Sequence, residues 1–374
     1  MKNRAIQEEQ YQDFSLRVHT QAGTKAQVVK AQVELTYGCN LHCVHCYTDC
    51  YNQHDLLKKE RTTEEILHTL DELYELGVLF VCFTGGEIFM RKDFRQIYDH
   101  AKGKGFLITL FTNGTMFTED IVDHLKKSPP FCIDISCHGA TEETFDGITQ
   151  VPGSFKRFLK GIELLRSRDL PFKLKTKAMT LNKHELDQIK DFVEGLGVRF
   201  QLSSTIYPRL NGDLEPCTYR LSPDEIVELE FAENDFDEED EACPVETGSG
   251  EDLEPPPDDR LFRCGCGTFG VHINAWGKLG ACTWVNEPRA NLGEKSVSQG
   301  IAEIFPQIRG AAYQTDTPCR SCQVYTLCDK MPSIARAENG DREQPVEHFC
   351  KTAFKRAERI AEEQEKPGLI EDKV

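Results

Sequence analysis

Residues 62–87 read TTEEILHTLDELYELGVLFVCFTGGE, and this stretch combines a helix pattern with a strand pattern. Thr62 and Glu65 have the spacing of a capping box, which marks the start of a helix. In the run 78–83, the side chains on both faces of the strand would be apolar, as in a parallel strand that is covered on both sides. The apolar side of the helix that would cover it comprises Ile66, Leu67, Leu70, Leu73 and Tyr74. The stretch therefore predicts one helix–strand unit of an α/β protein.

The same alternation extends to both sides of this stretch. Strand-like runs lie at 106–111, 131–136, 172–179 and 198–203, and an earlier run ends at Leu35. Helical patterns lie between the runs, at 93–102, 119–127, 155–166 and 186–195. About six such strand–helix units can be counted, and units of this kind form a parallel sheet. The segment is shorter than the roughly 250 residues of a closed eight-unit barrel, so we expect a partial (β/α)6 barrel.

The run 172–179, FKLKTKAM, differs from the other strands because it carries three lysines. Lys173, Lys175 and Lys177 alternate with other residues, which places their ammonium groups on one side of the strand. Two interpretations follow. The strand could lie at an edge of the sheet or face solvent, where lysines prevent pairing with other chains. Alternatively, one lysine pairs with a ligand carboxylate at the open end of the sheet.

Composition and charge limit the classes of protein that this chain can represent. The 374 residues are 39% hydrophobic and 28% charged, which is typical of a folded chain, and the formal net charge is −18. A strongly acidic protein binds nucleic-acid phosphates poorly, so we expect no nucleic-acid partner. The sequence has no run of roughly 18 apolar residues and no apolar signal segment. We therefore expect a cytoplasmic protein without a membrane partner.

The segment 233–259 contains thirteen acids and no lysine or arginine, so it contributes −13 of the net charge of −18. Its composition and the three prolines at 255–257 are typical of a solvated linker, and an acidic patch that binds a partner is the alternative. We use this segment as a boundary. The predicted order is an N-terminal extension at 1–27, the partial barrel at 28–232, the linker, and a cysteine-rich domain at 260–374.

The cysteine-rich domain has many turn residues and little helical periodicity up to residue 350. We therefore expect metal, rather than a large apolar core, to organise it. The stretch 351–365 is predicted to be a charged helix. Seven cysteines lie in this domain: Cys264, Cys266, Cys282, Cys319, Cys322, Cys328 and Cys350.

The densest group of metal-ligand residues is CNLHCVHC at 39–46, directly after the first strand-like run. Its three thiolates form a C-x3-C-x2-C pattern, which suits zinc or an iron–sulfur cluster. Three ligands on a four-iron cluster would leave one iron open for a substrate or a cofactor. The alternative is a closed zinc site, whose fourth ligand would be Cys50, His42 or His45.

Together with three further segments, this triplet resembles the radical S-adenosylmethionine (SAM) superfamily. Thr84-Gly85-Gly86-Glu87 ends the second strand, and it is similar to the family segment that holds the SAM amino group. Thr112-Asn113-Gly114 ends the third strand, and Asp134-Ile135-Ser136 lies where many members have a serine that contacts the ribose. Parallel α/β sheets bind ligands at the carboxyl ends of their strands, which agrees with these positions.

The resemblance implies a [4Fe–4S] cluster held by the triplet Cys39, Cys43 and Cys46. Cys50 would be a bystander, and His42 and His45 would lie beside the cluster without binding iron. Tyr47 is implied to lie next to the adenine, while Ile88 departs from the family pattern, which often has proline there. The residues implied for SAM binding are Tyr47, Gly85, Gly86, Glu87, Asn113 and Ser136.

The second half resembles the SPASM domain, a small C-terminal domain with a β-hairpin and two auxiliary iron–sulfur clusters. The resemblance rests on the spacing of Cys266, Gly277 and Cys282 and on the later cysteines. An outer cluster is implied to be held by Cys319, Cys322, Cys328 and Cys350. An inner cluster is implied to be held by three thiolates, those of Cys264, Cys266 and Cys282. Because Pro332 stands where the family has another cysteine, we expect the inner cluster to be open to a substrate thiolate or to a further ligand such as Cys217 or Cys243.

These resemblances imply radical chemistry. A reduced cluster passes one electron to SAM, and the resulting 5′-deoxyadenosyl radical abstracts a hydrogen atom from the substrate. Members with SPASM domains mostly act on peptides, so we expect a peptide maturase that forms a thioether or another crosslink, with auxiliary clusters supporting the oxidation. The expected partners are a peptide substrate with a leader sequence and a reductant such as flavodoxin or ferredoxin.

Two alternatives to peptide maturation stay open. Within the same superfamily, the chain could oxidise or dehydrogenate a small molecule such as a sugar or a cofactor precursor. In a different class, all cysteine groups would be structural zinc ligands and the acidic segment would recruit partners. The first 27 residues are fewer than the roughly 50 that a small domain needs, so we expect a leader peptide to bind elsewhere.

Overall fold

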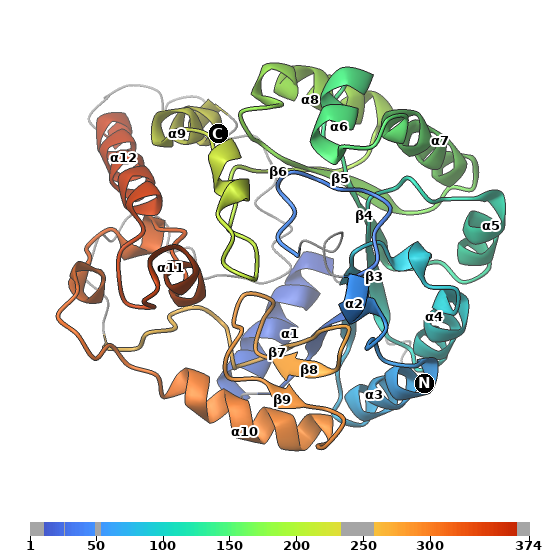
Figure 1. The fold of residues 1–374 in the computed structure, drawn as a ribbon, viewed down its shortest axis with the longest axis horizontal. Coiled ribbons are helices and arrows are strands. Elements are labelled where there is room, and N and C mark those ends of the chain that lie inside the picture. Colours follow the sequence, from blue (N-terminus) through green and yellow to red (C-terminus); the bar gives the residue numbers. More distant parts are fainter. Residues whose placement is uncertain (1–10, 26, 49–53, 233–257, 365–374) are drawn as a thin grey trace, which may run out of the picture.

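The computed structural model describes residues 11–25, 27–48, 54–232 and 258–364. Within these residues the strands form one nine-stranded sheet in the order β6-β5-β4-β3-β2-β1-β7-β8-β9 (Figure 1). Each strand from β1 to β6 pairs in parallel with the next one along the chain, which confirms the predicted α/β partial barrel. Its strands are β1 (Lys30–Thr36), β2 (Phe80–Gly85), β3 (Leu107–Thr112), β4 (Cys132–Ser136), β5 (Phe172–Lys177) and β6 (Phe200–Ser203).

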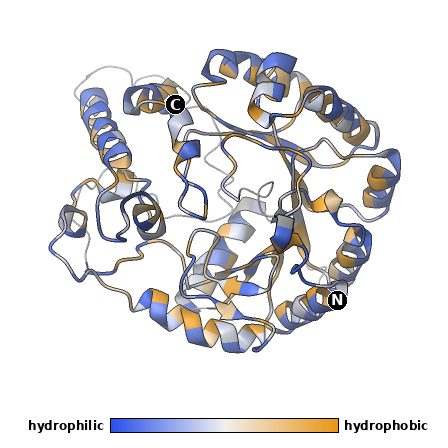
Figure 2. Cartoon of the chain, viewed as in Figure 1, coloured by the Kyte–Doolittle hydropathy of each residue, from blue (hydrophilic) through white to orange (hydrophobic). Residues whose placement is uncertain are grey.

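Helices cover the outer side of this parallel region, and their outward surfaces are largely hydrophilic (Figure 1, Figure 2). They are α3 (Thr63–Glu75), α4 (Phe94–Gly103), α5 (Glu119–Lys127), α6 (Glu142–Thr149), α7 (Ser154–Ser167) and α8 (Leu186–Leu196). The predicted capping box between Thr62 and Glu65 forms at the start of α3. Tyr74 was predicted on the apolar face but is 52% exposed, because its ring lies at the rim against Phe106 and Lys104.

The lysine-bearing strand β5 is paired with β4 on one side and β6 on the other. The prediction of an edge strand is therefore wrong. Leu174 belongs to the core that lies beneath the helices, so the alternating lysines face the inner side of the curved sheet. Lys173 is 8% exposed, which rules out the solvent-facing interpretation for that side chain.

The cysteine-rich segment continues the same sheet. Strand β7 (Gly270–Ile273) runs parallel to β1, and β8 (Lys278–Gly280) and β9 (Ala290–Asn291) follow as antiparallel neighbours. The expectation that metal replaces an apolar core here is wrong, because Val271 and Leu279 are part of the main hydrophobic core. So are residues of α10 (Val297–Arg309), a helix that the sequence analysis missed.

Other α-helices of the described chain are α1 (Tyr11–Lys25), α2 (His54–Leu57), α9 (Pro223–Ala232) and α11 (Pro332–Asn339). The predicted charged helix is α12 (Glu347–Gln364). Pro332, which replaces a family cysteine, is the first residue of α11. Of the acidic segment, 233–257 lies outside the described residues, while Asp259 forms an ion pair with Arg320 at 2.7 Å. Among the described helices, none has the length and apolarity needed to cross a membrane.

Candidate functional site

The cysteine loop 39–46 leaves the carboxyl end of β1 and is fastened to the end of α6. The backbone N–H of His42 donates to the carbonyl of Thr149 at 2.9 Å, and that of Val44 donates to Ile148 at 3.0 Å. The side chain of Val44 packs in a small apolar cluster that includes Ile148. Helix α6 therefore fixes the loop that carries the three predicted ligands.

The three thiols of this loop lie around one location. Burial raises the pKa of Cys39 to about 12, and neighbouring Glu87 and Cys46 raise it further. Burial, Cys46 and Cys39 together hold the pKa of Cys43 well above its usual range. In the described parts of the chain, no three His, Cys, Asp or Glu side chains are arranged to hold a single metal ion. A set of three soft thiolate donors has the chemistry of an iron–sulfur ligand set.

Asn113, from the end of β3, lies against the cysteine loop. Its Nδ2 donates to Oδ1 of Asn40 at 2.9 Å and lies 3.9 Å from Sγ of Cys39. Its Oδ1 accepts from the backbone N–H of Thr115 at 2.9 Å, which fixes the orientation of the amide. Thr115 in turn accepts from Asn40 at 2.8 Å. The amide thus directs a donor at the first cysteine.

The double glycine at the end of β2 lies against the backbone that leads into the cysteine loop. Gly85 has φ +136°, and a Cβ there would lie 2.1 Å from the carbonyl oxygen of Thr36. A Cβ on Gly86 would lie 2.3 Å from the oxygen of Gly38. The N–H of Gly86 donates to Thr36 at 2.8 Å, and that of Glu87 donates to Gly38 at 2.8 Å. Only glycine permits this approach, which sets the position of the loop.

Glu87 is fully buried and its carboxylate is engaged by the protein itself. Its oxygens accept from the hydroxyl of Thr112 at 2.8 and 2.9 Å and from the backbone N–H of Asn113 at 2.8 Å. The N–H of Phe89 adds a fourth contact at 3.3 Å. Burial raises the pKa of Glu87 to about 7, against the opposing effect of these donors. Glu87 therefore braces the ends of β2 and β3.

Two residues that the sequence analysis missed hold the backbone before the cysteine loop. The carboxylate of Glu60 accepts from the N–H of Tyr37 at 2.6 Å and from the hydroxyl of Thr36 at 2.9 Å. Arg91 donates to the carbonyl of Leu35 at 2.9 Å. Charged residues in loops usually face water, so their sequence context gave no signal for this role.

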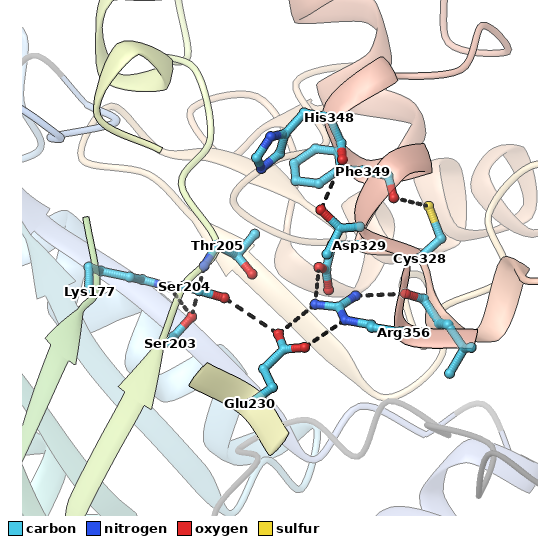
Figure 3. A network of polar contacts seen from close by, with 12 residues as sticks. Lys177, Ser203, Ser204, Thr205, Glu230, Cys328, Asp329, His348, Phe349 and Arg356 are labelled. Carbon is cyan, nitrogen blue, oxygen red and sulfur yellow. Dashed lines mark hydrogen bonds and ion pairs between the residues drawn. The ribbon is translucent and has the colours of Figure 1, made fainter. Parts of the chain in front are cut away.

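Lys177 lies at the carboxyl end of β5, near the cysteine loop. Its Nζ donates to Oγ of Ser203 at 2.7 Å, and burial followed by the charge of Lys175 lowers its pKa to about 8 (Figure 3). Lys177 in turn lowers the pKa of His45, which places the two side chains in the same region. Ser136 is the last residue of β4 and pairs in register with Lys175. The lysines that alternate along β5 thus end beside the predicted ribose serine and the cysteine loop.

Tyr47 joins the cysteine loop to the C-terminal segment. Its ring lies 4.9 Å from that of Trp284, measured between centroids, and Trp284 lies 4.7 Å from Tyr207. The carbonyl of Tyr47 accepts from the N–H of Leu210 at 2.8 Å. Trp284 is two residues after Cys282, so this aromatic group connects two of the predicted cluster regions.

The seven cysteines of the C-terminal segment lie in two groups of neighbours, one with Cys264, Cys266 and Cys282 and one with Cys319, Cys322, Cys328 and Cys350. Hydrogen bonding between thiols lowers the pKa of Cys264 to about 6 and raises that of Cys266, which also bonds Cys282. In the other group, charge interactions link Cys328 to Cys350 and Cys322, and link Cys350 to Cys319 and Cys322. None of the cysteines that the structure describes forms a disulfide.

Cys217 and Cys243 are the two cysteines predicted as further ligands of the inner group. Cys217 has Arg220, Glu338 and Asp213 as its charged neighbours, and burial raises its pKa to about 11. Cys243 lies outside the described residues, as does the bystander Cys50. The fourth ligand of the inner group therefore stays a prediction.

A polar network ties the outer cysteine group to the barrel (Figure 3). Arg356 of α12 forms ion pairs with Glu230 at 2.6 Å and with Asp329 at 2.8 Å, and it donates to the carbonyl of Leu327 at 2.6 Å. Leu327 and Asp329 are the residues on either side of Cys328, and Glu230 belongs to α9. The network therefore fixes the loop that carries Cys328 against the region that follows β6.

Comparison with known proteins agrees with this geometry. Residues 33–196 match the family model described as the Radical SAM superfamily. The chain is 28% identical over 325 residues to an AdoMet-dependent heme synthase of Methanosarcina barkeri, covering 82% of this chain and 92% of that protein. It is 27% identical over 368 residues to the PqqA peptide cyclase of Bradyrhizobium diazoefficiens, covering 88% and 89%.

Two solved structures share the fold. SuiB of Streptococcus suis bound to S-adenosylmethionine has a TM-score of 0.67 at 15% identity, over 94% of this chain and 83% of that one. The structure of anSMEcpe with bound AdoMet has a TM-score of 0.60 at 13% identity, over 90% of this chain and 100% of that one. The residues matched by the family model include the cysteine loop, the double glycine and the strands that carry them, so residues 33–196 form a Radical SAM domain and the chain is an enzyme.

Proposed function

We propose that this enzyme is a peptide maturase, which abstracts a hydrogen atom from a peptide residue and then forms a thioether or another crosslink. A four-iron cluster held by Cys39, Cys43 and Cys46 would, with SAM bound to it, supply the radical chemistry that this reaction needs. The observation that carries the proposal is the gathering of the seven C-terminal cysteines into two groups on a segment continuous with the barrel sheet. Crosslinking removes electrons from the substrate, and additional iron–sulfur clusters would accept them.

The side chains of this protein would hold and orient the reacting groups. Cys39, Cys43 and Cys46 supply the three thiolates, and the hydrogen-bonded Asn113 keeps the first of them in place. Lys177 provides a buried cation beside the loop, suited to a carboxylate of the bound cofactor. Tyr47 and Trp284 form an aromatic wall between the radical site and the inner cysteine group, which would exclude water.

Relatives and structural neighbours support a peptide as the substrate. The PqqA peptide cyclase matches most of the chain, and part of the chain is 26% identical to AlbA, the antilisterial bacteriocin subtilosin biosynthesis protein of Bacillus subtilis. SuiB bound to the precursor peptide SuiA shares the fold with a TM-score of 0.66. We propose a substrate peptide with a leader sequence and a low-potential reductant such as flavodoxin or ferredoxin.

A second candidate substrate is a carboxylate-bearing small molecule. It is favoured by the lysines on the inner face of β5, where Asp134 lies 3.6 Å from Lys173 and 3.8 Å from Lys175. Two cations, Lys173 and Lys175, face one carboxylate in this group, and the excess of positive charge would attract an anionic substrate. The match to an AdoMet-dependent heme synthase covers 92% of that protein and points in the same direction.

Anaerobic reconstitution followed by turnover assays would separate these functions. Three four-iron clusters correspond to about 12 irons per chain, and the loaded protein would absorb near 400 nm. With SAM and a reductant, 5′-deoxyadenosine release should rise when a precursor peptide encoded next to this protein's gene is added. It should not rise when an iron porphyrin is added. The reverse stimulation would replace the peptide proposal with the small-molecule one.

Replacement of the C-terminal cysteines tests the role of the auxiliary clusters. Cys322→Ala should remove about 4 irons and abolish crosslinking, while cleavage of SAM continues. Cys132→Ala is the matched control, because this half-buried thiol of β4 belongs to none of the three groups. A colourless protein that binds zinc in place of iron would contradict both radical proposals.

A further inference from the structure

His138 follows β4 and lies beside the cysteine loop. The residue is 5% exposed, and its Nε2 lies 3.9 Å from Sγ of Cys43. We propose that His138 donates a hydrogen bond from Nε2 to the Cys43 thiolate and thereby sets the reduction potential of the cluster held by the cysteine loop. The inference rests on the iron–sulfur cluster of the radical SAM site and not on the identity of the substrate.

The position of His138 is fixed by the surrounding chain. Nδ2 of Asn182, a fully buried residue, donates to the carbonyl of His138 at 3.1 Å, and its Oδ1 accepts from the N–H of Met179 at 2.9 Å. The ring of Phe145 packs on the imidazole, with 5.4 Å between centroids. The backbone and the ring are therefore both held in the place from which Nε2 reaches Cys43.

The location of the proton on His138 follows from its two nitrogens. Nδ1 is buried and has no hydrogen-bond partner within the described chain. A neutral imidazole carries one N–H, on either of its two nitrogens. A proton on Nδ1 would leave a buried donor unpaired and would turn the lone pair of Nε2 toward the thiolate. The proton therefore belongs on Nε2.

A second imidazole shields this hydrogen bond from water. The rings of His45 and His138 meet edge to face with 5.0 Å between centroids. In a site of low polarity, a hydrogen bond to a thiolate is stronger than the same bond in water.

The effect on the cluster has a definite direction. Reduction adds negative charge to the cluster, and a donor on one of its thiolates stabilises that charge, which raises the potential. A hydrogen bond to a charged group contributes enough free energy to change an equilibrium about tenfold. His138→Leu should therefore make reduction about tenfold less favourable, which is about 59 mV for a one-electron couple.

The test is a redox titration of the fully loaded protein, followed through the electron paramagnetic resonance signal that changes when SAM is added. That response separates the radical SAM cluster from the auxiliary clusters. His138→Gln keeps an N–H near the place of Nε2 and should return the potential toward that of the parent. His19→Leu is the matched control, because His19 is 7% exposed and stacks on Phe80, at the opposite end of β2. A parent-like potential in iron-replete His138→Leu would overturn the proposal.

A measurement on the parent protein covers the case in which His138→Leu fails to load iron. With 15N-labelled histidine and unlabelled SAM, pulsed resonance of the reduced cluster should show coupling to an imidazole nitrogen, and His138→Gln should lose it. Absence of the coupling, or its persistence in His138→Gln, would overturn the role of His138. Absence of any SAM-responsive signal in the parent would instead overturn the cluster on which the proposed function also depends.

Discussion

The hydroxyl of Thr112 donates to the carboxylate of Glu87 and lies 2.8 and 2.9 Å from its two oxygens. This contact joins the ends of β2 and β3 inside the core, beside the residues that reach the cysteine loop. A carboxylate with no access to solvent is tolerated here because the hydroxyl of Thr112 and the backbone N–H groups of Asn113 and Phe89 all donate to it.

Glu87 should make the stability of the fold depend on pH. Its pKa rises from 4.5 to about 7 on folding, so its favourable contribution is complete below pH 4.5 and is lost as the pH rises toward 7. Between pH 5 and pH 8 the unfolding free energy of the parent should fall by up to about 3 kcal/mol relative to Glu87→Gln. Anaerobic urea unfolding at both pH values would measure this difference. Equal pH dependence in the two proteins would contradict the prediction.

Gly86→Ala should destabilise the protein by about 3 kcal/mol or more, because its Cβ would lie 2.3 Å from the carbonyl oxygen of Gly38. The change should also reduce the iron bound by the cysteine loop, since that backbone leads into it. Gly195→Ala, within α8 and with open space around it, is the control and should stabilise by about 1 kcal/mol. Thermal unfolding and iron analysis of both variants would test this, and a harmless Gly86→Ala would refute the close approach.

Lys177 should make SAM binding weaken at alkaline pH. Its pKa is about 8, so the cation that would pair with the cofactor carboxylate is lost as the pH rises through that value. Lys177→Met should bind SAM about tenfold more weakly at pH 7 and show no such pH dependence, while Lys177→Arg should retain most of the affinity. Titration calorimetry under anaerobic conditions at pH 7 and pH 9 would decide. Unchanged affinity in Lys177→Met would remove this lysine from the SAM site.

Arg356→Ala should destabilise the outer cysteine group. The guanidinium is 13% exposed and pairs with Glu230 and Asp329, whose side chains are 34% and 33% exposed, so its removal leaves two half-buried carboxylates without their cation at a cost of about 1 kcal/mol. About 4 irons should be lost, while the radical SAM cluster remains. Arg359→Ala, on the same helix with a side chain that is 41% exposed, is the control. Full iron content in Arg356→Ala would show that the network does not support this group.

Much of the barrel could be predicted from local patterns. The helix that became α3 carries its own capping box, and α5 begins and ends at the predicted residues 119 and 127. Helix α6 was missed because it is short, with few apolar residues to show a period. The carbonyls of its last residues, Ile148 and Thr149, nevertheless accept hydrogen bonds from the backbone of the cysteine loop. The prediction therefore lacked the helix that holds this loop in place.

The sequence alone determined the strand–helix order and predicted which cysteines would form each group, because those features depend on residue spacing along the chain. Only the tertiary structure decided that β7 pairs with β1 and that the lysines of β5 face inward. Strand alternation places Lys173, Lys175 and Lys177 on one face but does not say which face is buried. Contacts such as His138 with Cys43 join residues far apart in the chain, and they exist only once the sheet brings its carboxyl ends together.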